Sequence, residues 1–266
     1  MRLMTASAFF LVAGCALVES PGERAAVILA EASLVSFALP DDRMVAFGRG
    51  ARAERLTIYL ESDGAPWPWP DEPPSDPTPV VPTVVRMAAA DRAPAVAYVG
   101  RPCQYLRPDR LAVCDPAFWT LGRFSEAAVA MTNAAVEELR RRHGASRIDL
   151  VGYSGGGAMA VLVASRRSDV SCLVTVAAPL DIDAWTVAKQ VTPLYGSLNP
   201  TNFPLPTSVR QTHFRGVQDQ VVPLHTISRY LAQAPHSQVV DVPRYGHDCC
   251  WAGNWSELLK QSCLRS

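Results

Sequence analysis

Short apolar runs and longer helical patterns alternate along most of this chain. Apolar runs of about four to eight residues between turn residues are typical of buried strands. They occur at 33–39, 44–47, 55–60, 95–99, 148–151, 172–176, 210–214 and 238–242. Helices are expected at 83–90, 125–142, 158–164, 227–234 and 255–261. The alternation predicts an α/β fold with a mostly parallel sheet that is covered by helices on both faces.

The helix expected at 125–142 has the clearest boundaries. Ser125 is a suitable N-cap, and Gly144 is a suitable stop. An apolar stripe runs along it through Ala128, Met131, Ala135 and Leu139. Such a stripe indicates one face packed against the sheet.

Two long stretches interrupt the regular pattern. Residues 66–82 are dense in proline, which excludes a regular helix or a central strand there. Residues 178–208 form an insertion without clear periodicity. Long irregular loops of this kind are often lids, so both are possible parts of a lid or cap.

Composition narrows the classes of partner. The chain has 266 residues, of which 48% are hydrophobic, enough for one large domain with a sizeable core. Lys plus Arg and Asp plus Glu each number 25, and no dense basic run is present, which disfavours nucleic acid. We therefore expect a single domain over residues 28–266.

The N-terminus is typical of a targeting segment. Arg2 precedes an apolar run that ends before Cys15, so residues 1–14 are expected to be a signal peptide and 15–27 a tether. The sequence Val12–Ala13–Gly14–Cys15 resembles the bacterial lipobox, in which the cysteine carries the lipid. That resemblance implies export and a lipid anchor at Cys15 in the bacterial cell envelope, with the outer membrane favoured by Ala16. An ordinary secretory signal is the alternative.

The six remaining cysteines fit an exported protein with disulfides. Cys103 and Cys114 bracket a short loop and are the pair most readily proposed. The other four, Cys172, Cys249, Cys250 and Cys263, are not assigned, although adjacency of Cys249 and Cys250 favours two different partners over one metal. No spacing resembles a zinc site.

The segment around Ser154 carries the strongest chemical motif. The predicted strand 148–151 runs into Gly152–Tyr153–Ser154–Gly155–Gly156, which matches G-x-S-x-G, and then into a small-residue helix. A serine at a sharp turn between a strand and a helix is the nucleophile elbow. The turn would present the Ser154 hydroxyl and direct the backbone N–H of Gly155 at a developing oxyanion.

An acid and a histidine follow two later strands. Asp219 follows strand 210–214, and His247 follows the last strand, 238–242. The order serine, acid, histidine is that of α/β-hydrolases. Asp181 and Asp183 compete with Asp219 for the acid position. The competing histidines do not follow the last strand: His143, His213, His225 and His236.

These motifs together resemble a bacterial α/β-hydrolase of the exported lipoprotein kind, a serine hydrolase family. The matching segments are 56–64, 100–105, 152–157 and 246–251, and the resemblance covers residue 30 to the end. It implies the α/β-hydrolase fold, with Ser154 as nucleophile, His247 as general base and acid, and Asp219 orienting the imidazole.

The second oxyanion donor departs from the pattern that relatives with a His-Gly dipeptide show. This chain has Glu61–Ser62–Asp63–Gly64 at that place, which leaves the donor open between Ser62 and Asp63. A carboxylate beside an oxyanion is repulsive, so Glu61 and Asp63 are expected to point away or be paired. Trp67 and Tyr153 are the candidate substrate contacts.

The resulting expectation is an esterase that acts on a small-molecule carboxylic ester through an acyl-enzyme. A peptidase or amidase with the same triad, and an envelope lipoprotein that binds a ligand without turnover, are the alternatives. No metal and no organic cofactor are implied.

Overall fold

The computed structural model describes residues 20–65 and 72–265. The predicted signal peptide, the lipidation site Cys15 and the substrate contact Trp67 lie outside the described residues. Most of the proline-rich segment 66–82 is described and is irregular up to the helix that begins at Thr83.

An eight-stranded sheet forms the centre of the molecule, in the order β1-β2-β4-β3-β5-β6-β7-β8. Its strands are β1 (Val35–Phe37), β2 (Ala46–Arg49), β3 (Arg55–Leu60), β4 (Val96–Val99), β5 (Arg147–Tyr153), β6 (Val170–Val176), β7 (Arg210–Gly216) and β8 (Gln238–Val242). β2 pairs antiparallel with both β1 and β4. All other neighbouring strands of the sheet, from β4 through β3 to β8, pair in parallel. The predicted mostly parallel sheet is confirmed.

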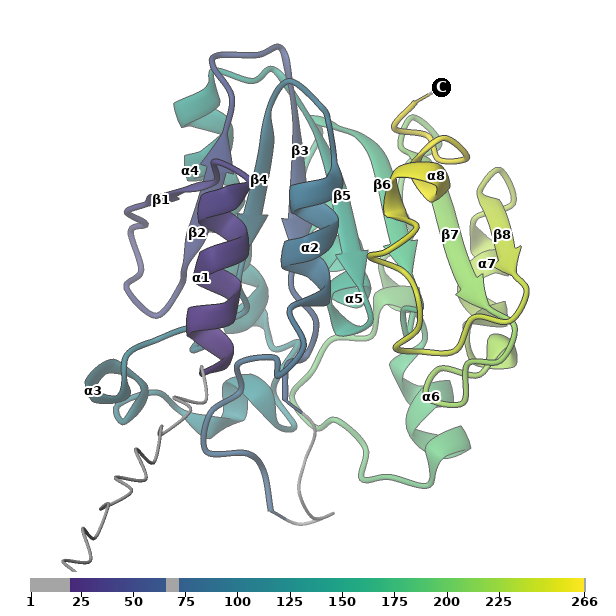
Figure 1. Ribbon diagram of the computed structural model, residues 1–266. Coiled ribbons are helices and arrows are strands. Elements are labelled where there is room, and N and C mark those ends of the chain that lie inside the picture. The colour runs from purple at the N-terminus through teal and green to yellow at the C-terminus, as the bar shows by residue number, and fades with distance from the viewer. Residues whose placement is uncertain (1–19, 66–71, 266) are drawn as a thin grey trace, which may run out of the picture.

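Helices cover both faces of this sheet (Figure 1). On one face lie α1 (Pro21–Glu31), α2 (Thr83–Ala90) and α8 (Trp255–Leu259). On the other lie α4 (Glu126–His143), α5 (Gly155–Ala164), α6 (Ile182–Lys189) and α7 (Ser228–Gln233). The short α3 (Pro108–Leu111) contributes no buried residue. Each face of the sheet thus has its own apolar core.

The central strands of the sheet are almost continuously apolar in sequence because both of their faces are buried. Six of the seven residues of β5 are buried, and all ten of α5 are. Parallel strands between two helical layers have this property. The elements that flank Ser154 are therefore among the most enclosed in the molecule.

Besides the four-residue α3, two longer helices lie where the sequence pattern predicted none. Helix α1 begins at Pro21, inside the segment expected to be a tether, and it buries Ala25 and Leu29. Ser20 and Glu23 form a capping box around a proline at the first turn, which favours this start. The folded part therefore begins before residue 28. Helix α6 lies in the 178–208 insertion, where Asp181 caps its N-terminus.

The predicted disulfide Cys103–Cys114 is confirmed. Cys172 pairs with Cys263, and Cys249 pairs with Cys250. The expectation that the adjacent cysteines take different partners is therefore wrong, because Cys172 and Cys263 are both buried and pair with each other.

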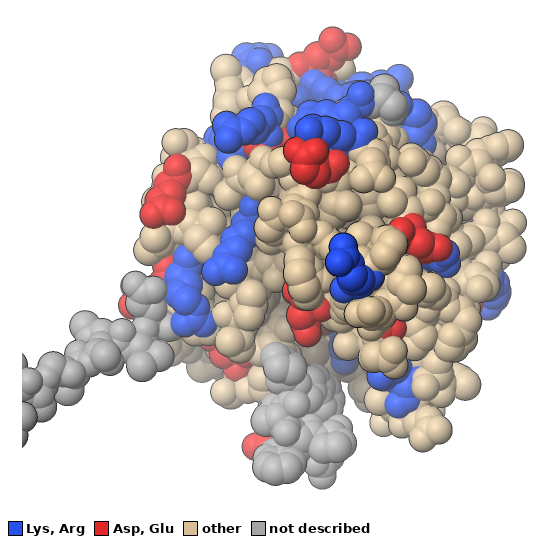
Figure 2. All heavy atoms as spheres, turned by 45° about the vertical axis from the view of Figure 1, so that its right-hand side comes forward, with Lys and Arg blue, Asp and Glu red and all other residues tan. Residues whose placement is uncertain are grey.

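The outer surface is mixed in charge. Figure 2 brings the β8 side of the molecule forward, and uncharged side chains cover most of that face, with acidic groups next to several basic ones. Among residues 20–65 and 72–265, no helix has the length and apolar character needed to span a bilayer.

Candidate active site

Ser154 lies at the abrupt turn from β5 into α5. Its backbone has φ 53° and ψ −129°, a conformation that a non-glycine residue holds only when its surroundings impose it. Close backbone approach explains the flanking glycines. A Cβ at Gly152 would be 2.1 Å from the Gly156 carbonyl oxygen, and a Cβ at Gly156 would be 2.3 Å from that of Leu60. The packing of α5 against β3 and β5 therefore fixes the turn that presents the serine.

A continuous chain of hydrogen-bonding groups joins Ser154, His247 and Asp219. The His247 Nε2 atom is 3.0 Å from Ser154 Oγ, and its Nδ1 atom is 2.9 Å from Asp219 Oδ2. The other carboxylate oxygen, Oδ1, accepts the backbone N–H groups of Val221 and Val222, each at 2.8 Å. The Asp219 side chain is 1% exposed and that of His247 10%. The structure thus brings together the three residues that the sequence singled out.

The backbone of His247 is held by two aromatic side chains. The Tyr153 hydroxyl donates to the His247 carbonyl at 2.9 Å, and Trp251 Nε1 donates to the same oxygen at 2.8 Å. The Tyr153 ring also lies 5.4 Å from the imidazole centroid at an interplanar angle of 34°. Tyr153, a predicted substrate contact, is 5% exposed and supports the histidine instead. Sequence reasoning missed the contribution of Trp251.

The competing residues have other partners. Asp181 Oδ1 accepts from Ala184 N and from Asn199 Nδ2, and Asp183 Oδ2 accepts from Asn199 Nδ2 at 2.9 Å. His213 is buried in β7 beside the Thr175 hydroxyl, and burial lowers its pKa to about 3. His143 Nδ1 lies 2.9 Å from the Leu139 carbonyl. None of these groups contacts Ser154.

Of the two candidate oxyanion donors in the turn after β3, Ser62 and Asp63, only one has a backbone N–H that is not already hydrogen-bonded. The Ser62 N–H donates to Glu61 Oε1 at 2.7 Å, so it is already used. The Asp63 N–H has no hydrogen-bond acceptor in the part of the chain that the structure describes. Gly155 supplies the first N–H of α5, which has no intrahelical acceptor. Asp63 and Gly155 are therefore the two candidate donors.

Both acidic residues of this turn are paired, as expected. Glu61 Oε2 accepts the hydroxyls of Tyr98 at 2.7 Å and Tyr105 at 3.1 Å. Burial raises the pKa of Glu61, and these hydrogen bonds act against the rise. Asp63 forms ion pairs with Arg101 at 3.1 Å and Arg123 at 3.2 Å. Neither arginine was singled out from the sequence.

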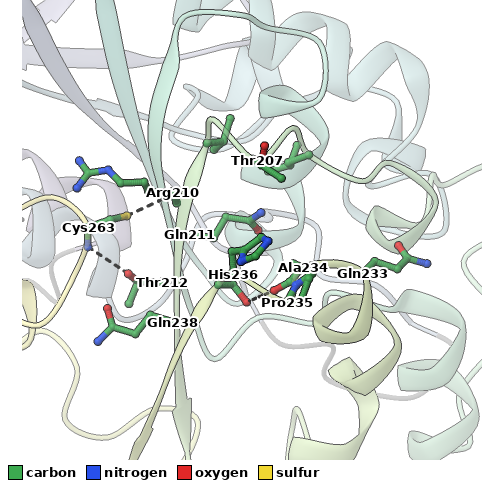
Figure 3. A pocket seen from close by; sticks show the side chains of 13 residues that line it. Thr207, Arg210, Gln211, Thr212, Gln233, Ala234, Pro235, His236, Gln238 and Cys263 are labelled. Atoms are coloured by element: carbon green, nitrogen blue, oxygen red, sulfur yellow. Dashed lines mark hydrogen bonds between the residues drawn. The ribbon is translucent and has the colours of Figure 1, made fainter.

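A separate pocket lies at the opposite edge of the sheet. It has a volume of about 280 Å³ and is lined by the amino-terminal ends of β7 and β8, with Cys263 in its wall (Figure 3).

Within the described ranges, no group of three or more His, Cys, Asp or Glu side chains is placed to bind a metal.

No protein-family model and no curated protein matches the sequence. Solved structures do match its fold. An esterase from Pyrococcus furiosus has 14% identity and a TM-score of 0.59 over 88% of this chain and 94% of its own. A candidate dienelactone hydrolase from Klebsiella pneumoniae has 12% identity and a TM-score of 0.59 over 88% and 98%.

The acylaminoacyl peptidase of Pyrococcus horikoshii is similar over 87% of this chain but only 40% of its own, with 14% identity and a TM-score of 0.55. At sequence identities this low, structural similarity supports a shared fold and does not establish a shared activity. The strand order, the elbow between β5 and α5 and these matches together show that the chain has the α/β-hydrolase fold.

Proposed function

We propose that this protein is a serine hydrolase that cleaves carboxylic esters through an acyl-enzyme intermediate. The observation that carries the proposal is the unbroken series Asp219–His247–Ser154, which ends on a serine held at a strained turn. A serine hydroxyl is a weak nucleophile, and an adjacent base oriented by an acid is the arrangement that activates it.

The proposed reaction follows from this geometry. As Ser154 Oγ attacks the ester carbonyl, His247 Nε2 takes the hydroxyl proton, while Asp219 stabilises the imidazolium. The charge on the carbonyl oxygen develops toward the N–H groups of Gly155 and Asp63. The imidazolium then gives its proton to the departing alcohol, and water repeats the sequence on the acyl-enzyme.

The same triad serves esterases and amidases, and we propose an ester because an alcohol is a better leaving group than an amine. Expulsion of an amine depends on its protonation by the histidine more strongly than expulsion of an alcohol does. A peptidase or amidase becomes the better description if amides are turned over as fast as esters.

The test is covalent labelling with a fluorophosphonate probe, followed by a panel of chromogenic esters and aminoacyl amides. Wild-type protein should be labelled once, and Ser154→Ala should not be labelled while its circular dichroism stays native. Ser165→Ala, at the other end of α5, is the matched control and should be labelled like wild type. Labelling of Ser154→Ala, or none of wild type, would refute the proposal.

We also propose that the protein is exported and lipid-anchored at Cys15. The lipobox-like sequence supports this, as do two buried disulfides, which persist in oxidising compartments. The acylated protein should enter the detergent phase on partitioning, and Cys15→Ser should stay in the aqueous phase or remain uncleaved. Equal partitioning of both proteins would contradict the anchor.

A further inference from the structure

A carboxylate lies directly beside the place where the oxyanion would form. Gly155 provides one candidate donor, and a Cβ built on it would be 1.9 Å from Asp63 Oδ1 and 2.6 Å from Oδ2. Asp63 also provides the other candidate donor, its own N–H. An oxyanion bound between these N–H groups would therefore be within a few ångströms of the Asp63 side chain.

An unpaired carboxylate at this distance would oppose catalysis. At an effective dielectric constant of about 20, two like unit charges about 4 Å apart repel strongly enough to slow a reaction by about 10³-fold. Loss of one oxyanion-hole donor lowers kcat by about 10²- to 10³-fold. The repulsion would therefore cancel roughly the benefit of one donor.

Two guanidinium groups meet this carboxylate, one on each oxygen. Arg101 Nη1 is 3.1 Å from Oδ1, and Arg123 Nη1 is 3.2 Å from Oδ2. Both cations are fixed by other contacts. Arg101 is 3% exposed, lies over the Phe124 ring at 4.9 Å and donates to the Arg123 carbonyl, while Arg123 Nε donates to the Thr120 carbonyl at 2.7 Å.

The rest of the turn is anchored by contacts that involve neither guanidinium group. Gln104 Nε2 donates to the Ser62 carbonyl at 3.2 Å, and Glu61 holds the Ser62 N–H. The position of the Asp63 backbone therefore does not depend on the two ion pairs alone. What the arginines add is charge, since two guanidinium groups contact the single carboxylate of Asp63.

We propose that Arg101 and Arg123 are positioning residues for this hydrolase, which neutralise Asp63 and keep a positive field at the oxyanion. The inference rests on the proposed function, because it assigns a role in stabilising that reaction's tetrahedral intermediate. Neither arginine contacts the reacting atoms. Their effect passes through Asp63, whose carboxylate inhibits the reaction when it is left unpaired.

The test is a double-mutant comparison at positions 101 and 63. Arg101→Met keeps the buried bulk of the side chain and removes the charge, so kcat should fall by about 10²-fold with little change in KM. Asp63→Asn removes the carboxylate charge and keeps the N–H and one oxygen acceptor, so its kcat is the reference for the double variant. The Arg101→Met/Asp63→Asn double variant should be more active than Arg101→Met alone, by about tenfold or more.

This rescue separates a charge role from a structural one. If Arg101 merely braces the turn, removal of a second contact leaves the double variant as poor as Arg101→Met or poorer, and the inference is wrong. Arg123→Met with and without Asp63→Asn repeats the comparison on a more exposed side chain, should Arg101→Met fold poorly.

Fluorophosphonate titration counts the folded sites in each variant. Loss of labelling in wild type defeats the proposed function, whereas normal labelling without rescue defeats only this inference.

Discussion

Asp219 and Asp181 are both buried carboxylates that follow a strand, yet only Asp219 reaches the histidine. Asp219→Asn should lower kcat by about 10⁴-fold, the loss that the wrong imidazole tautomer causes in the triad of a serine protease. The loop should survive, since the asparagine oxygen can still accept the N–H groups of Val221 and Val222. The kcat for ester hydrolysis by wild type and variant is the measurement.

Asp181→Asn is the matched control for that change. Asp181 caps α6 and contacts Asn199, so its replacement should lower stability modestly and leave kcat within a fewfold of wild type. If Asp181→Asn proved the more damaging to turnover, the acid of the site would have to be reassigned.

Sequence alone predicts those site residues that sit at the ends of strands. Ser154 follows β5, Asp219 follows β7 and His247 follows β8, and parallel strands bring such ends to one edge. The Asp63 ion pairs could not be predicted in this way. Arg101 and Arg123 come from separate loops, and no periodicity links them to the turn after β3.

At the scale of elements, the quality of a prediction follows the strength of local signals. Helix α4 is confirmed at both ends because Ser125 accepts the Ala128 N–H and Gly144 takes a left-handed conformation. Helix α6 was missed since only two of its eight residues are buried, which leaves little apolar periodicity to read. Helix α1 has a capping box that is visible in the sequence, but the helix lies next to the predicted signal peptide, and this position favoured the interpretation as a tether.

Strand β5 contains a buried carboxylate that should make stability depend on pH. Asp149 is 1% exposed, its Oδ2 atom is 3.4 Å from Arg55 Nε, and burial raises its pKa from 3.8 to about 6. Between these two values the folded protein binds a proton that the unfolded chain has released. Stability therefore falls as pH rises through this window, by at most about 3 kcal/mol.

Asp149→Asn should remove that loss. The difference in free energy of unfolding between variant and wild type should shift in favour of the variant from pH 4 to pH 6 and level off above about pH 7. Urea unfolding at each pH measures it, and the subtraction cancels all other titrating groups. Parallel curves for the two proteins would show that Asp149 ionises normally.

At the scale of the whole molecule, the three disulfides join cysteines whose separations along the sequence differ widely. Cys172–Cys263 joins β6 to the C-terminal segment across 91 residues, Cys103–Cys114 closes a loop across 11, and Cys249–Cys250 closes almost none. A crosslink limits the unfolded chain more when its loop is longer. The chain-entropy relation gives about 5 kcal/mol for the longest loop and about 3 kcal/mol for the shorter one.

Replacing each pair by alanine should therefore lower the free energy of unfolding in the order of loop length. Cys172→Ala/Cys263→Ala should cost most, and its burial adds lost packing to the loss of crosslink entropy. Cys103→Ala/Cys114→Ala should cost less, and Cys249→Ala/Cys250→Ala, whose cysteines are exposed, should change stability little. Guanidinium unfolding of the three variants against oxidised wild type gives the ranking. A larger loss from the adjacent pair than from Cys172 and Cys263 would mean that the loop near His247, and not chain entropy, dominates the contribution of the disulfides.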